Sequence, residues 1–240
     1  MKSTVALLAT LTGLAAATAS APALAAPPSP ELMDRIAAYA AGFEAMRTRV
    51  SFAVDGRMET LDRAGRTDAV KEMKARIEGD GHDAKFVVLK YTEDGEDKTA
   101  EAEKKARASA AERKAHPDKK RIRIPMLAAE QPRYVFDLVE IDRADPSRVR
   151  IAFVPKTPAD DAIEGSAWID SRTGAPIAAG FKISKTPIFV DYVHFTVEFG
   201  AQAGYGAAVS KVVVDGDGGV LFFRKRFHGT ATLSDYQIVP

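Results

Sequence analysis

The acidic residues near Asp215 are the pattern in this chain that comes nearest to a chemical site. Asp215-x-Asp217-x-Gly219 has the spacing with which a calcium-binding loop begins, where alternating carboxylates turn toward one cation. The third acidic ligand is absent, and Arg226 stands where such a loop needs a glutamate that binds with both oxygens. The segment therefore predicts a hairpin turn rather than a metal site.

The residues that hydrolytic chemistry requires are present but scattered. No G-x-S-x-G occurs, and Ser166 after Gly165 belongs to the start of a predicted strand. Asp160-Asp161 follows Pro158 in a predicted loop with no histidine beside it. The histidines are isolated from one another, at His82, His116, His194 and His228. Catalytic groups must lie within hydrogen-bond reach of each other. We expect no enzyme, no catalytic residue and no cofactor.

Met1–Ala25 has the three parts of a secretory signal peptide. Lys2 provides the positive start, Val5–Ala17 a short apolar core, and Ala23-Leu24-Ala25 a small-x-small cleavage site. A membrane anchor is the alternative, but the apolar core is shorter than the roughly 20 residues that span a bilayer. We expect cleavage near Ala25, a periplasmic location and no stable membrane insertion.

Composition restricts the remaining classes of function. The chain has 34 Lys and Arg against 33 Asp and Glu, and this balance does not favour nucleic-acid binding. It has no cysteine, which excludes disulfides, cysteine metal sites and acylation behind the leader. An exported chain without disulfides suits a bacterial periplasm. We expect residues 26–240 to form one domain and a monomer.

One amphipathic helix is predicted at the start of this domain. Ser29 can cap it and Pro30 fits its first position, where no N–H is needed. An apolar stripe with helical spacing follows, formed by Leu32, Ile36, Tyr39, Phe43 and Met46. The stripe predicts a helix that packs on a sheet, and whether it also lines a ligand cavity stays open.

From Arg49 onward the hydrophobic period is two, which indicates strands. Lys85–Tyr91, Tyr134–Ile141 and Arg148–Pro155 are clear examples. Val70–Glu78 fits a helix or a strand, and its strand neighbours favour the second. Phe189–Phe199 (FVDYVHFTVEF) places apolar and polar side chains on opposite faces, which is typical of an antiparallel sheet.

Lys98–Ala115 interrupts the strands inside an insertion of about 96–120. It is rich in Ala, Glu, Lys and Arg and contains no large apolar residue, so it predicts an exposed, mobile helix. Charge pairs such as Glu101–Lys105 and Glu103–Arg107 would support it. A solvated helix and an arm that docks a partner are both compatible with this composition.

The predicted fold class is α+β, with nine to eleven short strands in one large, curved antiparallel sheet that does not close. The N-terminal helix lies on the concave face, and the charged helix is an insertion. A sheet with one apolar face offers more apolar surface than a single helix covers. Curling, a partner or a ligand must cover the rest.

The hairpin at Gly165–Lys185 carries a family resemblance. Trp168-Ile169-Asp170-Ser171-Arg172-Thr173-Gly174-Ala175-Pro176-Ile177 resembles the W-I-D-x-x-T-G-x-P-I hairpin of the periplasmic outer-membrane lipoprotein-sorting (LolA-like) superfamily, which includes sensors that regulate anti-sigma factors. Thr230–Ile238 is similar to that family's last strand. Two departures are the charged insertion, where the family has an apolar lid, and the small residues of Ala178–Phe181.

The resemblance implies an unclosed half-barrel whose apolar cavity holds acyl chains of lipids or lipoproteins. The candidate contacts, each of which core packing would also explain, are Leu32, Ile36, Tyr39, Phe43, Phe136, Phe153, Trp168, Phe195 and Val197. Two alternatives remain. One is a regulatory module of the same fold that contacts an envelope protein through the charged insertion. The other is an envelope hydrolase, which would need a cleft of clustered carboxylates and histidines.

Overall fold

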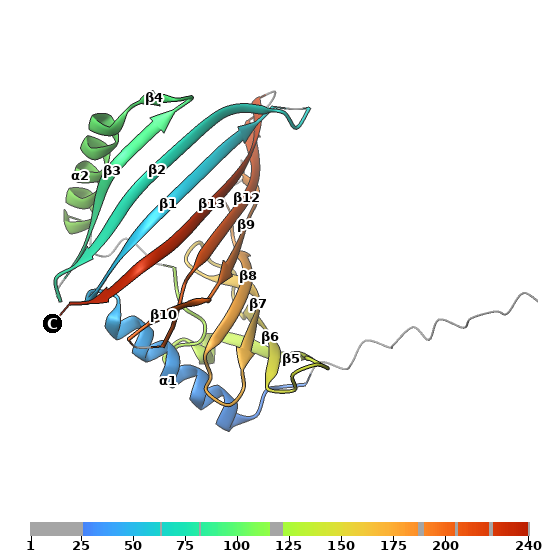
Figure 1. Cartoon of the computed structure of the whole chain (residues 1–240). Helices are drawn as coiled ribbons and strands as arrows, with labels where there is room; N and C mark the ends of the chain where they lie inside the picture. Colours follow the sequence, from blue (N-terminus) through green and yellow to red (C-terminus); the bar gives the residue numbers. More distant parts are fainter. Residues whose placement is uncertain are drawn as a thin grey trace, which may run out of the picture.

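A curved antiparallel sheet of eleven strands is the framework of the protein (Figure 1). The computed structural model describes residues 26–62, 64–81, 83–115, 122–186, 190–204, 206–220 and 223–239. The predicted leader at 1–25, the end of the insertion at 116–120, His82 and Phe189 lie outside the described residues. The strand order is β4-β3-β2-β1-β13-β12-β9-β8-β7-β6-β5, so β4 and β5 form the two ends of an unclosed sheet.

The strands follow the predicted succession. Those before the insertion are β1 (Val50–Leu61), β2 (Thr67–Gly79), β3 (Ala84–Glu93) and β4 (Glu96–Asp97). Those after it are β5 (Tyr134–Ile141), β6 (Arg148–Pro155), β7 (Ile163–Asp170), β8 (Pro176–Ile183), β9 (Val190–Glu198), β12 (Lys211–Val220) and β13 (Phe223–Ile238). A separate hairpin consists of β10 (Ala201–Ala203) and β11 (Gly206–Ala208). Val70–Glu78 is a strand, as predicted, within β2.

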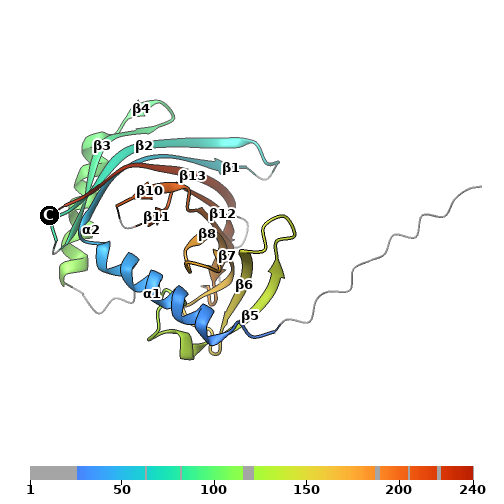
Figure 2. The same cartoon turned by 60° about the horizontal axis from the view of Figure 1, so that its bottom comes forward.

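The first helix, α1 (Pro30–Met46), begins as its sequence predicts. The Ser29 hydroxyl oxygen accepts a hydrogen bond of 3.3 Å from the Leu32 N–H. Leu32, Ile36 and Ala40 are buried. Figure 2 shows α1 inside the curve of the sheet. The α+β class and the concave position of α1 are confirmed.

Strand register explains why the two faces of the sheet differ. Residues directly opposite each other in neighbouring strands share a face. One such row on the concave face is apolar apart from the hydroxyl of its last residue. From β5 to β3 it reads Leu138, Ile151, Ala167, Ala179, Val197, Val212, Ala231, Gly56, Met73 and Tyr91.

The adjacent row on the convex face is mostly charged. It reads Glu140, Arg150, Trp168, Ala178, Glu198, Lys211, Thr232, Asp55, Lys74 and Lys90. Its members pair along the row: Glu140 and Arg150 form an ion pair of 2.6 Å, and the Arg150 guanidinium lies 5.8 Å from the centre of the Trp168 ring. The polar face therefore points to solvent and the apolar face points to α1.

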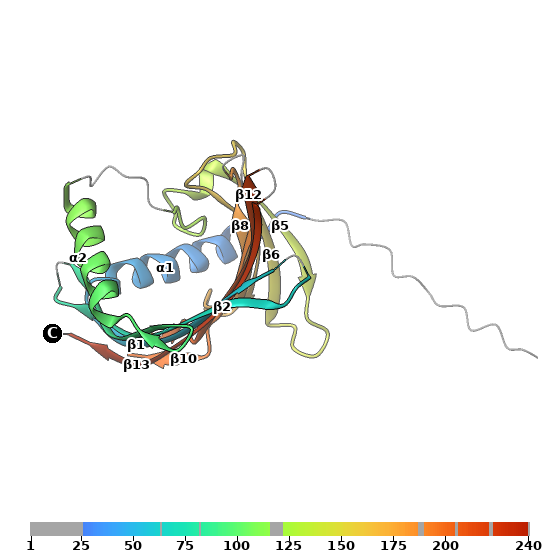
Figure 3. The ribbon, with the colours of Figure 1, turned by 90° about the horizontal axis from the view of Figure 1, so that it is seen from above.

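The insertion forms a second helix, α2 (Thr99–Ala115), as predicted. It packs against β3 and lies on the same side of the sheet as α1 (Figure 3). Ala102, Ala106 and Ala110 follow at every fourth position and are half-buried, so small side chains form the packed face. Absence of large apolar residues thus did not prevent packing, because alanine allows a close approach.

The predicted turn at Asp215–Gly219 is wrong. These residues continue β12 and pair with Arg224–His228 of β13, and the pairing extends to Val220. Gly216 is compatible with a strand because the ring of Phe227 occupies the place of its missing side chain. Neighbouring side chains therefore compensate for the glycines that the sequence pattern associates with a turn.

Candidate ligand cavity

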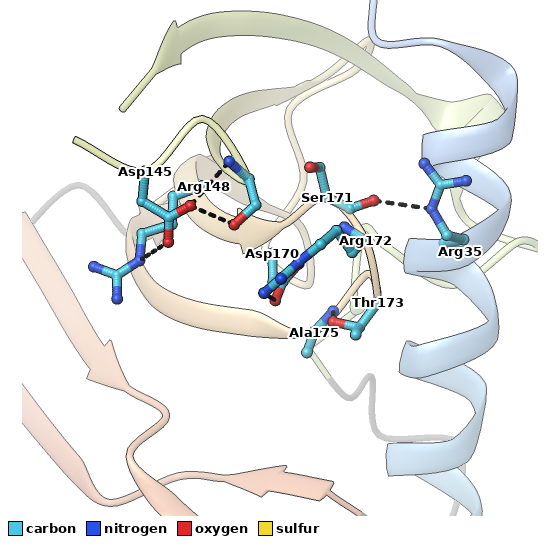
Figure 4. Close-up of polar contacts among 9 residues, drawn as sticks. Arg35, Asp145, Arg148, Asp170, Ser171, Arg172, Thr173 and Ala175 are labelled. Atoms are coloured by element: carbon cyan, nitrogen blue, oxygen red, sulfur yellow. Dashed lines mark hydrogen bonds and ion pairs between the residues drawn. The ribbon is translucent and has the colours of Figure 1, made fainter. Parts of the chain in front are cut away.

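The turn between β7 and β8 holds α1 against the sheet (Figure 4). Asp170 accepts hydrogen bonds from the Arg172 backbone N–H at 2.9 Å and from its guanidinium at 3.0 Å. Both contacts hold the pKa of Asp170 below its usual value, and the guanidinium of Arg172 has the larger effect. The Arg35 side chain of α1 donates to the Ser171 carbonyl oxygen at 2.9 Å. The turn between β7 and β8 therefore positions α1.

Gly174 makes that close approach possible. Its φ of +76° suits glycine, and it is buried against α1. A Cβ at this position would lie 2.5 Å from the carbonyl oxygen of Arg35. The Thr-Gly of the hairpin thus has a packing role.

An apolar cavity of about 300 Å³, partly open to solvent, lies between α1 and the sheet. Ile36, Tyr39, Ala40 and Phe43 of α1 form one wall. The floor comes from β6 to β9 and the residues beside them, namely Phe153, Ile163, Ala167, Ile169, Gly174, Pro176, Ala179, Phe181, Val197, Phe199 and Val209. Nearly all of the exposed wall is carbon, because the concave row of the sheet is apolar.

A strap, Ile122–Met126, closes another side of the cavity. The Arg123 guanidinium donates to the Asp161 carboxylate, with Nε at 3.0 Å and Nη2 at 2.8 Å from its oxygens. The Arg123 backbone N–H also donates to the Asp161 carbonyl oxygen at 2.8 Å. The carboxylate raises the pKa of Arg123. Because the Asp161 side chain is only 7% exposed, this ion pair is shielded from water and holds the strap firmly.

The β10–β11 hairpin lies beside the cavity, where it contacts the lining residue Tyr39. The Tyr39 hydroxyl donates to the Ala207 carbonyl oxygen at 2.9 Å, and burial raises the pKa of Tyr39. The Tyr236 hydroxyl donates to the Val209 carbonyl oxygen at 2.6 Å. A bulge with Asp235 at φ +55° lies next to Tyr236, which stacks on Phe52. Two tyrosines therefore join this hairpin to α1 and to β13.

The structure brings five of the nine predicted contact residues together around the cavity: Ile36, Tyr39, Phe43, Phe153 and Val197. Leu32 lies in the neighbouring core, and Phe136 packs against that core. Phe195 stacks on the lining residue Phe181, with ring centres 5.4 Å apart.

Trp168 lies on the convex face, because its neighbours Ala167 and Ile169 point to the cavity. It therefore does not line the cavity.

Sequence reasoning missed the strap. Ile122, Ile124 and Met126 line the cavity, yet they follow a charged insertion and belong to no long apolar pattern. The alternation Ile122-Arg123-Ile124 before Pro125 was the available signal. Phe181 was also missed, although it lies on the returning strand of the central hairpin.

The described residues contain no group of three or more His, Asp or Glu side chains placed to hold a metal ion. Among the same residues, no helix is long and apolar enough to cross a membrane.

Comparison with models of known protein families finds no match, and comparison with curated proteins finds none either. Among solved structures, a DUF1329 family protein from Desulfovibrio piger superposes with a TM-score of 0.42 at 10% identity, covering 89% of this chain and 94% of that one. A LolA superfamily protein from Nitrosomonas europaea has a TM-score of 0.37 at 9% identity, covering 87% and 94%.

The MucA/MucB complex from Pseudomonas aeruginosa has a TM-score of 0.22 at 12% identity, covering 85% and 99%. A LolA superfamily protein is thus among the similar structures.

Proposed function

We propose that the protein is an exported, non-enzymatic carrier that holds acyl chains of lipids or lipoproteins in the cavity beneath α1. The observation that supports this most is the cavity itself, which is roofed by a helix and a strap and has an almost entirely apolar wall. Ligand pockets are mostly apolar and range from about 300 to 1,000 Å³. The leader-like sequence at 1–25 and the hairpin resemblance support the periplasm as the site of action.

Burial of the chain would supply the affinity. Each methylene removed from water contributes about 0.8 kcal/mol, from which the cost of immobilising the ligand must be subtracted. Ile36, Phe43, Phe153 and Val197 are the proposed contacts among the predicted residues. Leu32 and Phe136 support the wall from the core, and Phe195 extends it beside Phe181.

Two neighbouring alanines in β8 provide a matched test. Ala179 lines the cavity, whereas Ala178 lies on the convex face opposite Trp168. Ala179→Leu should fill part of the cavity and weaken dodecanoate binding by about tenfold or more, because the space of about two methylenes is lost. Ala178→Leu adds the same group outside and should leave the affinity unchanged. Isothermal titration calorimetry measures both.

Thermal unfolding of both variants shows whether they remain folded. Equal dodecanoate affinity in the two variants, or no binding by the unaltered protein, would contradict the proposal.

A protein-interaction module is the second candidate, and one feature of α2 favours it. Lys104 and Lys114 are exposed, and neither forms an ion pair with a residue that the structure describes. Lys105 and Arg107, in contrast, pair with Glu101 and Glu103 at 2.7 and 3.3 Å. Free lysines on the outer side of α2 could meet an acidic surface of an envelope protein.

Glutamate at both Lys104 and Lys114 would test this candidate. If α2 docks a partner, the double variant should lose a protein captured by chemical crosslinking in the periplasm, while its dodecanoate affinity stays unchanged. Lys185→Glu, an exposed lysine outside α2, is the control. Identical crosslinks in all three proteins would exclude α2 as the docking element.

A further inference from the structure

We propose that the cavity holds one acyl chain at a time and does not distinguish the polar head group attached to it. This rests on the proposed function and adds the number of chains and the lack of head-group selectivity. Two features support it: the hydrogen bonds and charges of the polar groups around the cavity, and the size of the space.

Two lining residues among those the structure describes carry a hydroxyl or charged side chain, Tyr39 and Arg123. The Tyr39 hydroxyl already donates to the Ala207 carbonyl oxygen. Its proton is therefore not available to a head group unless the β10–β11 hairpin moves. Specific ligand sites usually contain a few polar groups aimed at the ligand, and Tyr39 is aimed at the protein instead.

Arg123 is the group that could recognise an anionic head. Asp161 accepts hydrogen bonds from its Nε and Nη2, and this carboxylate neutralises the guanidinium. Nη1 makes no hydrogen bond to any residue that the structure describes, but an anion there would also face the Asp161 carboxylate. The negative charge of Glu130 also raises the pKa of Arg123. Among the described residues the charge at this position is therefore not positive, and an anionic head gains little there.

The size of the cavity limits the number of chains. Its volume of about 300 Å³ lies at the lower end of the range for small-molecule sites. α1, the strap and the sheet bound it, so a second chain finds no equivalent space. The head group must then remain outside, in water.

The test compares ligands that share a chain and differ in head group. Dodecanoate, dodecanol and dodecylphosphocholine are titrated into the mature protein below their critical micelle concentrations, with octanoate and decanoate as shorter chains. Affinity should rise by about fourfold per methylene along the carboxylate series. The three heads should bind within about threefold of each other, well below the tenfold that 1.4 kcal/mol represents. Native mass spectrometry should show one ligand per protein.

The outcomes are distinct. A charge-assisted hydrogen bond from Arg123 would favour dodecanoate over dodecanol by about tenfold or more. That preference would overturn the inference, and its loss in Arg123→Lys would identify the guanidinium as the cause. Two ligands per protein would overturn the single-chain part. Absence of binding by every ligand would contradict the proposed function, and this inference with it.

Discussion

Gly174 shows how one residue decides where the helix lies. Its left-handed backbone and its contact with Arg35 both exclude a side chain. Gly174→Ala should lower the free energy of unfolding by about 1–3 kcal/mol for the backbone alone. A crowded contact adds about 1–3 kcal/mol more.

Gly95→Ala is the control, because Gly95 has φ +83° and no atom within 4 Å of a built Cβ. Urea unfolding should show a larger loss for Gly174→Ala than for Gly95→Ala. Equal losses would mean that the contact with α1 does not matter.

The lowered pKa of Asp170 should make the stability of the protein depend on pH. Its pKa is lowered in the folded protein by the Arg172 side chain and by backbone N–H groups. The charged carboxylate is therefore stabilised by folding, and this contribution is present above the unfolded pKa and lost as pH falls through the folded pKa. Asp170→Asn keeps an acceptor oxygen but removes the charge.

The free energy of unfolding of Asp170→Asn should thus be lower than that of the unaltered protein at neutral pH. The difference should shrink as the solution becomes more acidic than the usual aspartate pKa of 3.8. Urea unfolding over a pH series measures it, and a difference that stays constant with pH would show that the charge of Asp170 contributes nothing.

At the scale of elements, α2 has a buried and an exposed face despite its uniform composition. Ala106 is half-buried against the sheet and Ala108 is exposed. Ala106→Glu should destabilise the packing of α2 by about 1–3 kcal/mol, because it forces a carboxylate into a close contact. Ala108→Glu has the same cost in helix propensity, but its side chain is exposed. It should therefore destabilise the packing of α2 little beyond that cost.

Hydrogen exchange of the α2 amides distinguishes the two variants. Faster exchange in Ala106→Glu alone is the expected result. Similar exchange in both variants would show that the helix is held by its ends rather than by its alanine face.

Alternation of apolar and polar residues made most strands predictable, because residues that face the core must recur every second position. The same rule failed where side chains are small. The glycines of β12 resembled a turn in the sequence. The ring of Phe227 from the neighbouring strand takes the place of a side chain at Gly216, so β12 has no apolar pattern of its own there. The contact of α2 with β3 was not predicted either, because the packed face of α2 consists of alanines and has no large apolar residue.

At the scale of the whole molecule, the curved sheet and its concave helix followed from the sequence, but the cavity did not follow completely. Five predicted residues line it because α1 and the sheet supply regular apolar faces. The position of the strap was not predicted, because Arg123 and Asp161 lie 38 residues apart and no local pattern joins them. The family resemblance suggested Trp168 as a cavity contact, whereas the Trp168 ring lies on the convex face beside the guanidinium of Arg150.

The most direct test of the cavity as an acyl-chain site is a crystal structure of the mature protein with ω-bromododecanoate. The bromine marks the end of the chain by its anomalous scattering. We expect one bromine site inside the cavity, near Ile36, Phe153 and Ala179, with the carboxylate outside. Bromine on the convex face, or no ordered bromine in crystals saturated with the ligand, would contradict it.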